Sequence, residues 1–354
     1  MKQRRKAISG AQIRAQLKAD LIGKDSFRGV TLTYAWLANQ FGHFALGFIP
    51  AMLLSVLLNY FMPANQAEKT APVVVGLLWF VFELYNFLGP LLSKYKSRSA
   101  RVFVPGARYQ FQPPWWNIAF DTATDVVFFN LGAFSAGYFM TGLPGMLIVA
   151  LVCLVLLLYP SRYWYSTKLI IQEAGYPFQF RLSQWDYSMS ETDRQTVIDF
   201  LNNAGSTCTH LLIFGASNSG KTSLAVGLAT ELSFRQQACT YGTANQWFEW
   251  MYPQQSPPAT GALPAWNWRS ADLLIVDDLN SGRPDLSPVI TPGEFQMALK
   301  NVLGDDQVNR KILCETSIIW VIGGTAASQE KSWRSFLKDL GVSNAAVHSV
   351  ELSG

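Results

Sequence analysis

The chain has 354 residues, of which 49% are hydrophobic and only 15% are charged, and its net charge is +4. That charge is divided unevenly, because residues 1–168 carry a net +10 and residues 169–354 a net −6. A basic, apolar first half is typical of a membrane part with cationic flanks, and an acidic second half is typical of a soluble domain. The acidic half also argues against a large basic nucleic-acid-binding face there.

The cysteines and histidines are too scattered to predict a metal site or a disulfide framework. No cysteines form a C-x-x-C pair, which fits reduced thiols in a cytosol-facing domain. The histidines are interpreted as packing or surface residues. These residues are Cys153, Cys208, Cys239, Cys314, His43, His210 and His348.

Residues 1–28 form the first predicted segment. They hold eight lysines and arginines against two acids, and Ile13, Leu17 and Leu21 recur at helical spacing. This pattern fits a basic amphipathic helix lying on a membrane surface. It fits a solvated tail equally well, because the apolar stripe is short.

Residues 29–165 form a predicted α-helical transmembrane domain. Four apolar runs follow one another in it, at 41–62, 71–92, 115–142 and 143–163. The first two reach the ~20 residues that a bilayer core demands. The apolar part of the last, 143–160, is slightly short but almost free of polar groups, and it can extend into the residues that follow. The third is the weakest because it contains Asp121 and Asp125, although its small residues suit close contact between helices. We therefore expect four spans.

The charge of the loops predicts the orientation of these spans. Five cations and no acid lie between the second and third runs, at Lys94, Lys96, Arg98, Arg101 and Arg108. The other two loops hold one lysine together. By the positive-inside rule, this loop and both chain ends lie in the cytoplasm, as in a bacterial inner-membrane protein.

Three acids fall within the predicted spans, namely Glu83, Asp121 and Asp125. An ionisable group in hydrocarbon is costly, so one interpretation is an ion or proton path. The other is that Asp121 and Asp125 lie near the cytoplasmic interface and that Glu83 pairs with a basic loop residue.

Residues 166–204 are predicted to connect the membrane domain to a second domain at 205–354. Ser188 or Ser190 is a suitable N-cap for a short helix that ends before Gly205. In the second domain, helical patterns separate apolar runs that read as strands, at 210–214, 237–244, 271–279, 316–324 and 347–352. This alternation predicts a three-layer α/β fold with a mainly parallel sheet and helices on both faces.

A complete phosphate-binding motif, G-x-x-x-x-G-K-[ST], follows the first of these strands and opens a helix. The glycines let consecutive backbone N–H groups face phosphates, Lys221 supplies a positive charge to the β- and γ-phosphates, and Thr222 offers a hydroxyl to Mg²⁺. The predicted nucleotide-binding residues are Gly215, Ala216, Ser217, Asn218, Ser219, Gly220, Lys221, Thr222 and Ser223.

Two acids end the strand at 271–279 and have the form of a Walker B motif. We expect Asp277 to hold Mg²⁺, directly or through water. We expect Asp278 to act as the general base that polarises the attacking water. Many ATPases have glutamate at the second position, and aspartate is one methylene shorter, so hydrolysis is expected to be slow.

The order of phosphate loop, extra strand, acidic strand and further strand resembles the AAA+ division of P-loop ATPases. The segments "IFGASNSGKTSLAVGLATEL" and "ADLLIVDDL" look most like the DnaC-like helicase loaders and the IstB-like insertion-sequence helper ATPases. The resemblance covers about residues 205–354 and is specific only at the nucleotide loop. It implies ATP as the nucleotide and Mg²⁺ as the cofactor.

Carried over to this sequence, the resemblance implies Thr325 as a sensor of the γ-phosphate. It also implies an arginine supplied by a neighbouring subunit, with Arg310 as the first candidate and Arg283 or Arg334 behind it. Thr325 could instead only cap a turn, and the arginines could be solvated surface residues. The chain ends soon after its last predicted strand, so a helical lid domain is expected to be missing.

These patterns together predict a membrane-anchored, Mg²⁺-dependent ATPase that works as a homo-oligomer. Its turnover would remodel or transport a macromolecule, either protein or DNA, beside the lipid bilayer. Two alternatives stay open. One is a nucleotide-gated channel or membrane effector, and the other is a scaffold that nucleotide orders without hydrolysis.

Overall fold

A computed structural model provides the fold of this chain and describes residues 8–21, 30–92, 110–205, 207–251, 266–280, 290–301 and 306–353. The chain divides into two compact units. The helical unit comprises Ile13–Arg108 and Pro113–Lys168. The α/β unit comprises Met1–Gln12, Tyr109–Gln112 and Leu169–Gly354.

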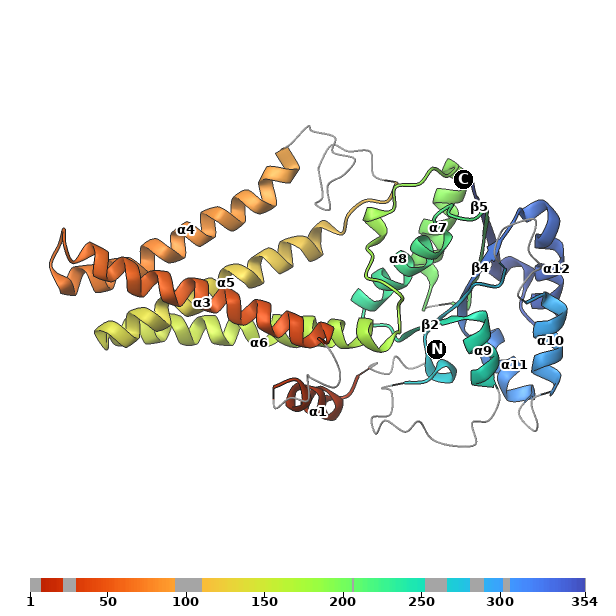
Figure 1. Cartoon of the computed structure of the whole chain (residues 1–354), viewed down its shortest axis with the longest axis horizontal. Coiled ribbons are helices and arrows are strands. Elements are labelled where there is room, and N and C mark those ends of the chain that lie inside the picture. The colour runs from red at the N-terminus through yellow and green to blue at the C-terminus, as the bar shows by residue number, and fades with distance from the viewer. Residues whose placement is uncertain are drawn as a thin grey trace. The chain divides into compact units, whose positions relative to one another are not determined.

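Long helices make up most of the helical unit (Figure 1). The elements are α1 (Gly10–Leu21), α3 (Leu32–Leu58), α4 (Ala64–Leu92), α5 (Trp115–Thr141) and α6 (Pro144–Glu173). Three segments are long and apolar enough to cross a membrane, namely Leu32–Leu58, Ala64–Leu88 and Pro144–Glu173. α5 is long enough but is not among them, so the fourth span stays a prediction.

The first and last of these helices extend beyond the predicted spans. α3 begins at Leu32 rather than at residue 41, because Thr31 caps it by accepting a hydrogen bond from the backbone N–H of Tyr34 (3.0 Å). α6 continues past residue 163 to Glu173. Both helices are therefore longer than the apolar runs from which the spans were predicted.

α3 and α5 approach each other closely through two glycines. A Cβ added at Gly47 would lie 2.0 Å from the carbonyl oxygen of Phe129, and one added at Gly132 would lie 2.0 Å from that of Phe44. Only glycine fits at both positions. The small residues of α5 thus serve helix contact, as expected.

The short helix α1 is held by a buried carboxylate rather than by an apolar stripe. Asp20 accepts hydrogen bonds from the hydroxyls of Thr31 (3.2 Å), Thr33 and Tyr165 (3.2 Å). These partners lie at the start of α3 and in α6. Residues 1–7 and 22–28 of the predicted basic segment lie outside the described residues.

The α/β unit contains one five-stranded parallel sheet in the order β2-β3-β4-β1-β5. The strands are β1 (His210–Gly215), β2 (Cys239–Thr243), β3 (Leu273–Asp277), β4 (Ser317–Gly323) and β5 (Val347–Leu352). Four of them lie within the runs predicted as strands, and β1 extends one residue beyond its predicted run, to Gly215. β4 lies between the loop-bearing β1 and the acidic β3.

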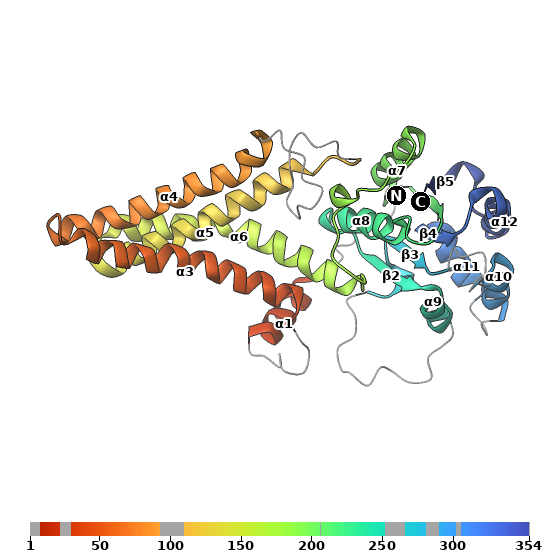
Figure 2. The ribbon, with the colours of Figure 1, turned by 45° about the horizontal axis from the view of Figure 1, so that its top comes forward.

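Helices cover both faces of this sheet (Figure 2). α7 (Glu191–Asn203) and α8 (Lys221–Phe234) pack on one face. The other face carries α9 (Ala244–Met251), α10 (Pro292–Asn301), α11 (Asp306–Glu315) and α12 (Ala326–Asp339). Short 3₁₀ helices lie at Leu182–Gln184, Trp268–Ser270 and Asn344–Ala346.

Alternation along the strands builds the two cores. On β1, Leu211 and Ile213 belong to the core under α8, and Leu212 and Phe214 belong to the core on the opposite face. Successive side chains of a strand point to opposite faces, so a fully apolar strand must be covered on both. The predicted three-layer architecture is observed.

Candidate functional site

The strand order and the helix connections predict where a ligand would bind. The chain leaves β1 through α8 on one face and leaves β4 through α12 on the other, although β1 and β4 are neighbours. In open parallel sheets, ligands bind outside the carboxyl ends of the strands at such a switch point. Here the two strand ends are joined by paired backbone hydrogen bonds between Gly215 and Gly324 (2.8 and 2.9 Å).

The glycine-rich motif forms the loop at this point. Asn218 (φ 63°) and Gly220 (φ 84°) have left-handed backbones, which turn neighbouring N–H groups towards one side of the loop. Gly215 is confined as well, because an added Cβ would lie 2.5 Å from the hydroxyl of Ser219. The loop ends at Lys221, the first residue of α8, so it lies at the positive end of a helix.

Two side chains of this loop donate hydrogen bonds to backbone carbonyl oxygens of the same loop. Lys221 donates from Nζ to the carbonyl oxygen of Ala216 (2.5 Å), and Ser223 donates to that of Gly220 (2.9 Å). The hydroxyl of Ser219 is buried without a partner within the described residues. Burial lowers the pKa of Lys221, and Asp277 and Asp278 oppose this effect. The two carboxylates therefore lie within electrostatic reach of the loop lysine.

Asp277 is the last residue of β3 and is buried. Its Oδ2 accepts a hydrogen bond from the hydroxyl of Tyr241 on the adjacent strand β2 (2.8 Å). Its Oδ1 accepts one from the backbone N–H of Asp278 (2.7 Å). Burial and the charge of Asp277 raise the pKa of Tyr241, so the phenol stays a donor. Two hydrogen bonds thus hold this carboxylate in place.

Asp278 turns away from the strand with a left-handed backbone (φ 56°). Such a conformation is uncommon outside glycine and is tolerated by aspartate. The residue as a whole is exposed, yet nearby protein removes part of the hydration of its carboxyl group. This loss and the charge of Asp277 raise the pKa of Asp278, and Lys221 opposes the shift.

Thr325 lies at the carboxyl end of β4, at the N-cap position of α12. It is exposed, and its hydroxyl lies 3.1 Å from that of Ser328. Beside it, Gln329 donates to the carbonyl oxygen of Gly323 (2.7 Å) and accepts from Asn280 (3.0 Å). Asn280 follows the acidic pair, so Gln329 links the ends of β3 and β4.

The candidate arginine was expected to come from a neighbouring subunit, so the positions of these residues within one chain leave that role a prediction. Arg334 donates to Glu330 (2.7 Å), to Ser349 (3.1 Å) and to the carbonyl oxygen of Val347 (2.9 Å), all within its own unit. Arg310 lies in α11 next to Asn309, which accepts a hydrogen bond from Arg269 just before β3 begins (3.2 Å). Arg269 and Asn309 therefore meet at the amino end of β3, whereas the glycine loop follows the carboxyl end of β1. Arg283 lies outside the described residues.

Sequence reasoning missed three aromatic residues at the site. Tyr241 bonds to Asp277, as described above. Trp185, in the connector, donates from its indole to the carbonyl oxygen of Gly220 (2.9 Å). Tyr187 lies over the same glycine, where an added Cβ would lie 2.5 Å from its ring. The connector is rich in aromatic residues, but that signal does not indicate which of them reach the loop.

The helical unit holds a second polar group. Nδ1 of His43 on α3 lies 2.9 Å from a carboxylate oxygen of Asp125 on α5. Glu83, which is buried on α4, and Asp121 lie within electrostatic reach of the same histidine. His43 packs against the ring of Phe129, with ring centroids 4.8 Å apart, so it is a packing residue as interpreted, but its contact with Asp125 was not predicted. His210 is a packing residue as well, stacked on Trp320.

The α/β unit is thus a P-loop-like domain, with a helix-opening glycine loop at the switch point of a parallel sheet. A crystal structure of DnaI is among the solved structures to which the chain is similar, at 15% identity over 50% of this chain and 89% of DnaI. The TM-score of 0.29 is too low to support any inference about function. No protein-family model matches the chain, and no curated protein matches it.

Proposed function

We propose that this protein is a membrane-anchored ATPase that uses Mg²⁺ and works as an oligomer on a macromolecular partner at the inner face of the membrane. The observation that carries the proposal is that three features lie at the carboxyl ends of neighbouring strands. These are the glycine loop after β1, the two acids at the end of β3 and the polar residues after β4.

The chemistry of the site supports phosphate and Mg²⁺ as ligands. The loop offers N–H groups, a half-buried lysine and the unpartnered hydroxyl of Ser219, which suit phosphate oxygens. Asp277 with the hydroxyl of Thr222 offers the oxygen ligands that Mg²⁺ prefers. Bound Mg²⁺ would neutralise charge on the phosphates.

The remaining roles follow from what each side chain is able to do. Lys221 would leave the carbonyl of Ala216 and bond to the phosphates. Asp278, partly exposed and beside Lys221, would orient the attacking water and accept its proton. A raised pKa brings a carboxylate closer to that task, because a stronger base takes a proton more readily. Thr325 and Gln329 would lie beside the terminal phosphate, at the end of β4.

The test is ATP hydrolysis by the full-length protein in nanodiscs, over a series of protein concentrations. We expect specific activity to rise with concentration and to vanish in Lys221→Ala and Asp278→Asn. Asp278→Asn is expected to retain ATP binding, because it removes a base and leaves the loop intact. Wild-type protein that binds ATP without turnover would contradict the proposed hydrolysis.

The polar group in the helical unit favours a second candidate function, a membrane effector that responds to nucleotide. His43, Asp125 and Glu83 come from three helices, and ionisable groups among apolar helices commonly mark a path for ions or protons. Ion flux in proteoliposomes, compared between wild type and Asp125→Asn, distinguishes this candidate. Flux that requires both ATP and Asp125 would establish it.

A further inference from the structure

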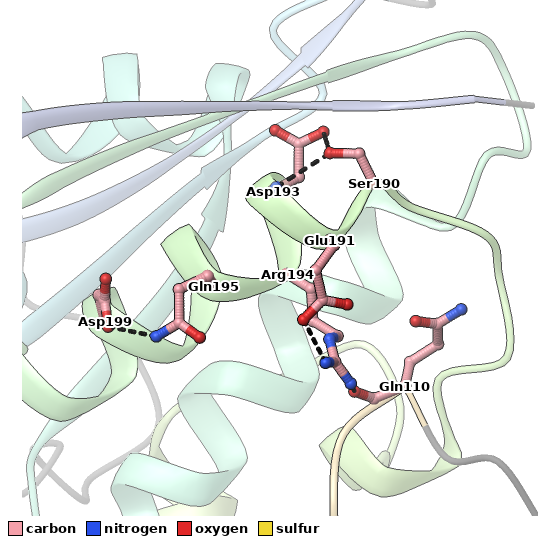
Figure 3. Close-up of polar contacts among 7 residues, drawn as sticks. All are labelled: Gln110, Ser190, Glu191, Asp193, Arg194, Gln195 and Asp199. Carbon is pink, nitrogen blue, oxygen red and sulfur yellow. Dashed lines mark hydrogen bonds and ion pairs between the residues drawn. The ribbon is translucent and has the colours of Figure 1, made fainter.

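Three residues just before α5 belong to the α/β unit rather than to the helical one. In the segment 110–112, Phe111 is only 4% exposed and packs in the core beneath α8. The backbone oxygen of Gln110 accepts a hydrogen bond from Arg194 at the start of α7 (3.4 Å), as Figure 3 shows. Arg194 is held in turn by Glu191, one turn earlier on the same helix. This segment is therefore anchored at two consecutive residues.

Phe111 packs against the tryptophan that bonds to the glycine loop. The ring centroids of Phe111 and Trp185 are 5.9 Å apart, in an edge-to-face arrangement. Trp185 is 2% exposed, and its indole N–H has the carbonyl oxygen of Gly220 as its acceptor. Gly220 directly precedes Lys221, so a single side chain separates Phe111 from the lysine-bearing end of the loop.

The connector that carries Trp185 is itself fixed along α8. Arg181 forms an ion pair with Glu231 (2.9 Å) and lies 3.8 Å from the ring centre of Phe234. The backbone of Leu182 leaves no room for a side chain at Gly227, where a Cβ would lie 3.0 Å from it. A fixed connector gives Trp185 little freedom to follow Gly220 if the loop changes shape.

This arrangement makes the loop and the segment sensitive to each other. A buried indole N–H that loses its acceptor carries a free-energy penalty, so a turn of the Gly220 carbonyl would require Trp185 to move. Trp185 forms the wall on which Phe111 packs. Gln112 and two prolines, Pro113 and Pro114, join Phe111 to the first residue of α5, and the fixed φ angles of the prolines limit the flexibility of this link.

We propose that Trp185 couples the glycine loop to the segment that leads into α5, with Phe111 as the receiving contact. The coupling rests on the proposed nucleotide binding and adds its regulation. Trp185 is a positioning residue, because it acts on the nucleotide through Gly220. Since coupling is reciprocal, if nucleotide changes the packing equilibrium of Phe111 by some factor, that packing changes nucleotide affinity by the same factor.

The test is hydrogen exchange of residues 110–120 in the full-length protein in nanodiscs, with and without ADP and Mg²⁺. We expect ADP to change the exchange of this segment in the wild type. Trp185→Phe keeps an aromatic ring and loses the N–H donor, so ADP is expected to bind while its effect on the segment disappears. Phe111→Ala is expected to shift the ADP dissociation constant about fivefold or more.

Trp247→Phe is the matched control. It also removes a buried indole N–H from a backbone carbonyl, that of Ile275 (3.0 Å), but on the other face of the sheet. It is expected to leave the ADP effect on residues 110–120 unchanged. An unchanged effect in Trp185→Phe, or an unchanged ADP affinity in Phe111→Ala, would overturn the coupling. A wild-type protein that does not bind ADP would overturn the proposed function as well, so the two failures are distinguishable.

Discussion

Hydrogen bonds from a neighbouring strand and from the next residue orient the carboxylate of Asp277. The hydroxyl of Tyr241 reaches it from β2, and the backbone N–H of Asp278 bonds to its other oxygen. If Asp277 holds Mg²⁺ as proposed, loss of a partner that orients it is expected to lower metal affinity about 10- to 100-fold. Among the residues outside the motifs, we therefore expect Tyr241 to have the largest effect on Mg²⁺ binding.

Replacement Tyr241→Phe removes this hydrogen bond and keeps the ring. We expect the Mg²⁺ concentration for half-maximal ATP hydrolysis to rise by about 10-fold or more, because the carboxylate is no longer held. Tyr176→Phe is the control, since Tyr176 bonds to Ser233 instead (2.9 Å). A Mg²⁺ dependence that is the same in Tyr241→Phe and in the wild type would refute this role.

His210 predicts a dependence of stability on pH. Burial lowers its pKa from 6.5 to about 3, and its Nδ1 accepts a hydrogen bond from the indole of Trp320 (3.2 Å). Between pH 6.5 and pH 3, His210 is protonated in the unfolded chain and stays neutral in the folded chain. Stability should therefore fall as pH falls from 6.5 towards 3, by about 1.4 kcal/mol per pH unit.

This effect is measurable through hydrogen exchange of the β1 amides at pH 7.5 and pH 5, corrected for intrinsic exchange rates. We expect His210→Gln, which keeps an acceptor but does not titrate, to lose less protection on acidification than the wild type does. Equal losses in the two proteins would rule out His210 as the source.

At the scale of elements, α3 and α5 pack so closely that the backbone of each helix lies against the backbone of the other. Gly47 and Gly132 leave space for the carbonyl groups of the opposite helix. Such close approach favours van der Waals packing, the main attraction between helices in lipid. The contact also brings His43 to Asp125, so the polar group depends on the glycines.

Gly47→Ala should therefore weaken the helical unit. The added methyl group would overlap the carbonyl oxygen of Phe129, and we expect a loss of about 1–3 kcal/mol of stability. Gly42→Ala on the same helix meets no atom within 4 Å and is expected to be neutral or stabilising, since alanine favours helix. Thermal unfolding of both variants in detergent, followed by circular dichroism, provides the comparison. Equal unfolding temperatures would contradict the packing argument.

Local sequence signals were present at one missed helix and at one predicted helix. Neither α9 nor α11 was predicted. Thr243 and Gln246 nevertheless form a capping box before α9, in which the backbone N–H of each residue bonds to the side chain of the other (3.0 and 3.4 Å). The T-x-x-Q pattern is visible in the sequence. α7 was predicted with Ser188 or Ser190 as its N-cap, and Ser190 is the cap, because its hydroxyl accepts a hydrogen bond from the N–H of Asp193 (3.0 Å).

At the scale of the whole molecule, α5 decides on which side of a membrane the α/β unit lies. If α3 to α6 all cross, the unit faces the cytoplasm with the N-terminus. If α5 does not cross, three spans place the unit outside, away from ATP. The positive charge of the loop before α5 favours four spans.

Cysteine labelling of intact cells tests this topology. Tyr60 is 82% exposed between α3 and α4, and the native Cys208 is exposed in the α/β unit. With four spans, an impermeant maleimide should label Tyr60→Cys in intact cells and Cys208 only after permeabilisation. Labelling of both from outside would mean that α5 does not cross.

The sequence by itself determined the features that short stretches encode. Buried apolar runs marked five strands, the spacing of Gly215, Gly220 and Lys221 marked the loop, and the serines at 188 and 190 marked a helix start. Each signal arises from backbone conformation or burial within a few residues. The tertiary structure alone decided that β4 separates β1 from β3, that Tyr241 meets Asp277, and that Phe111 packs on Trp185. These contacts join residues far apart in the chain, and only the packing of both faces of the sheet brings them together.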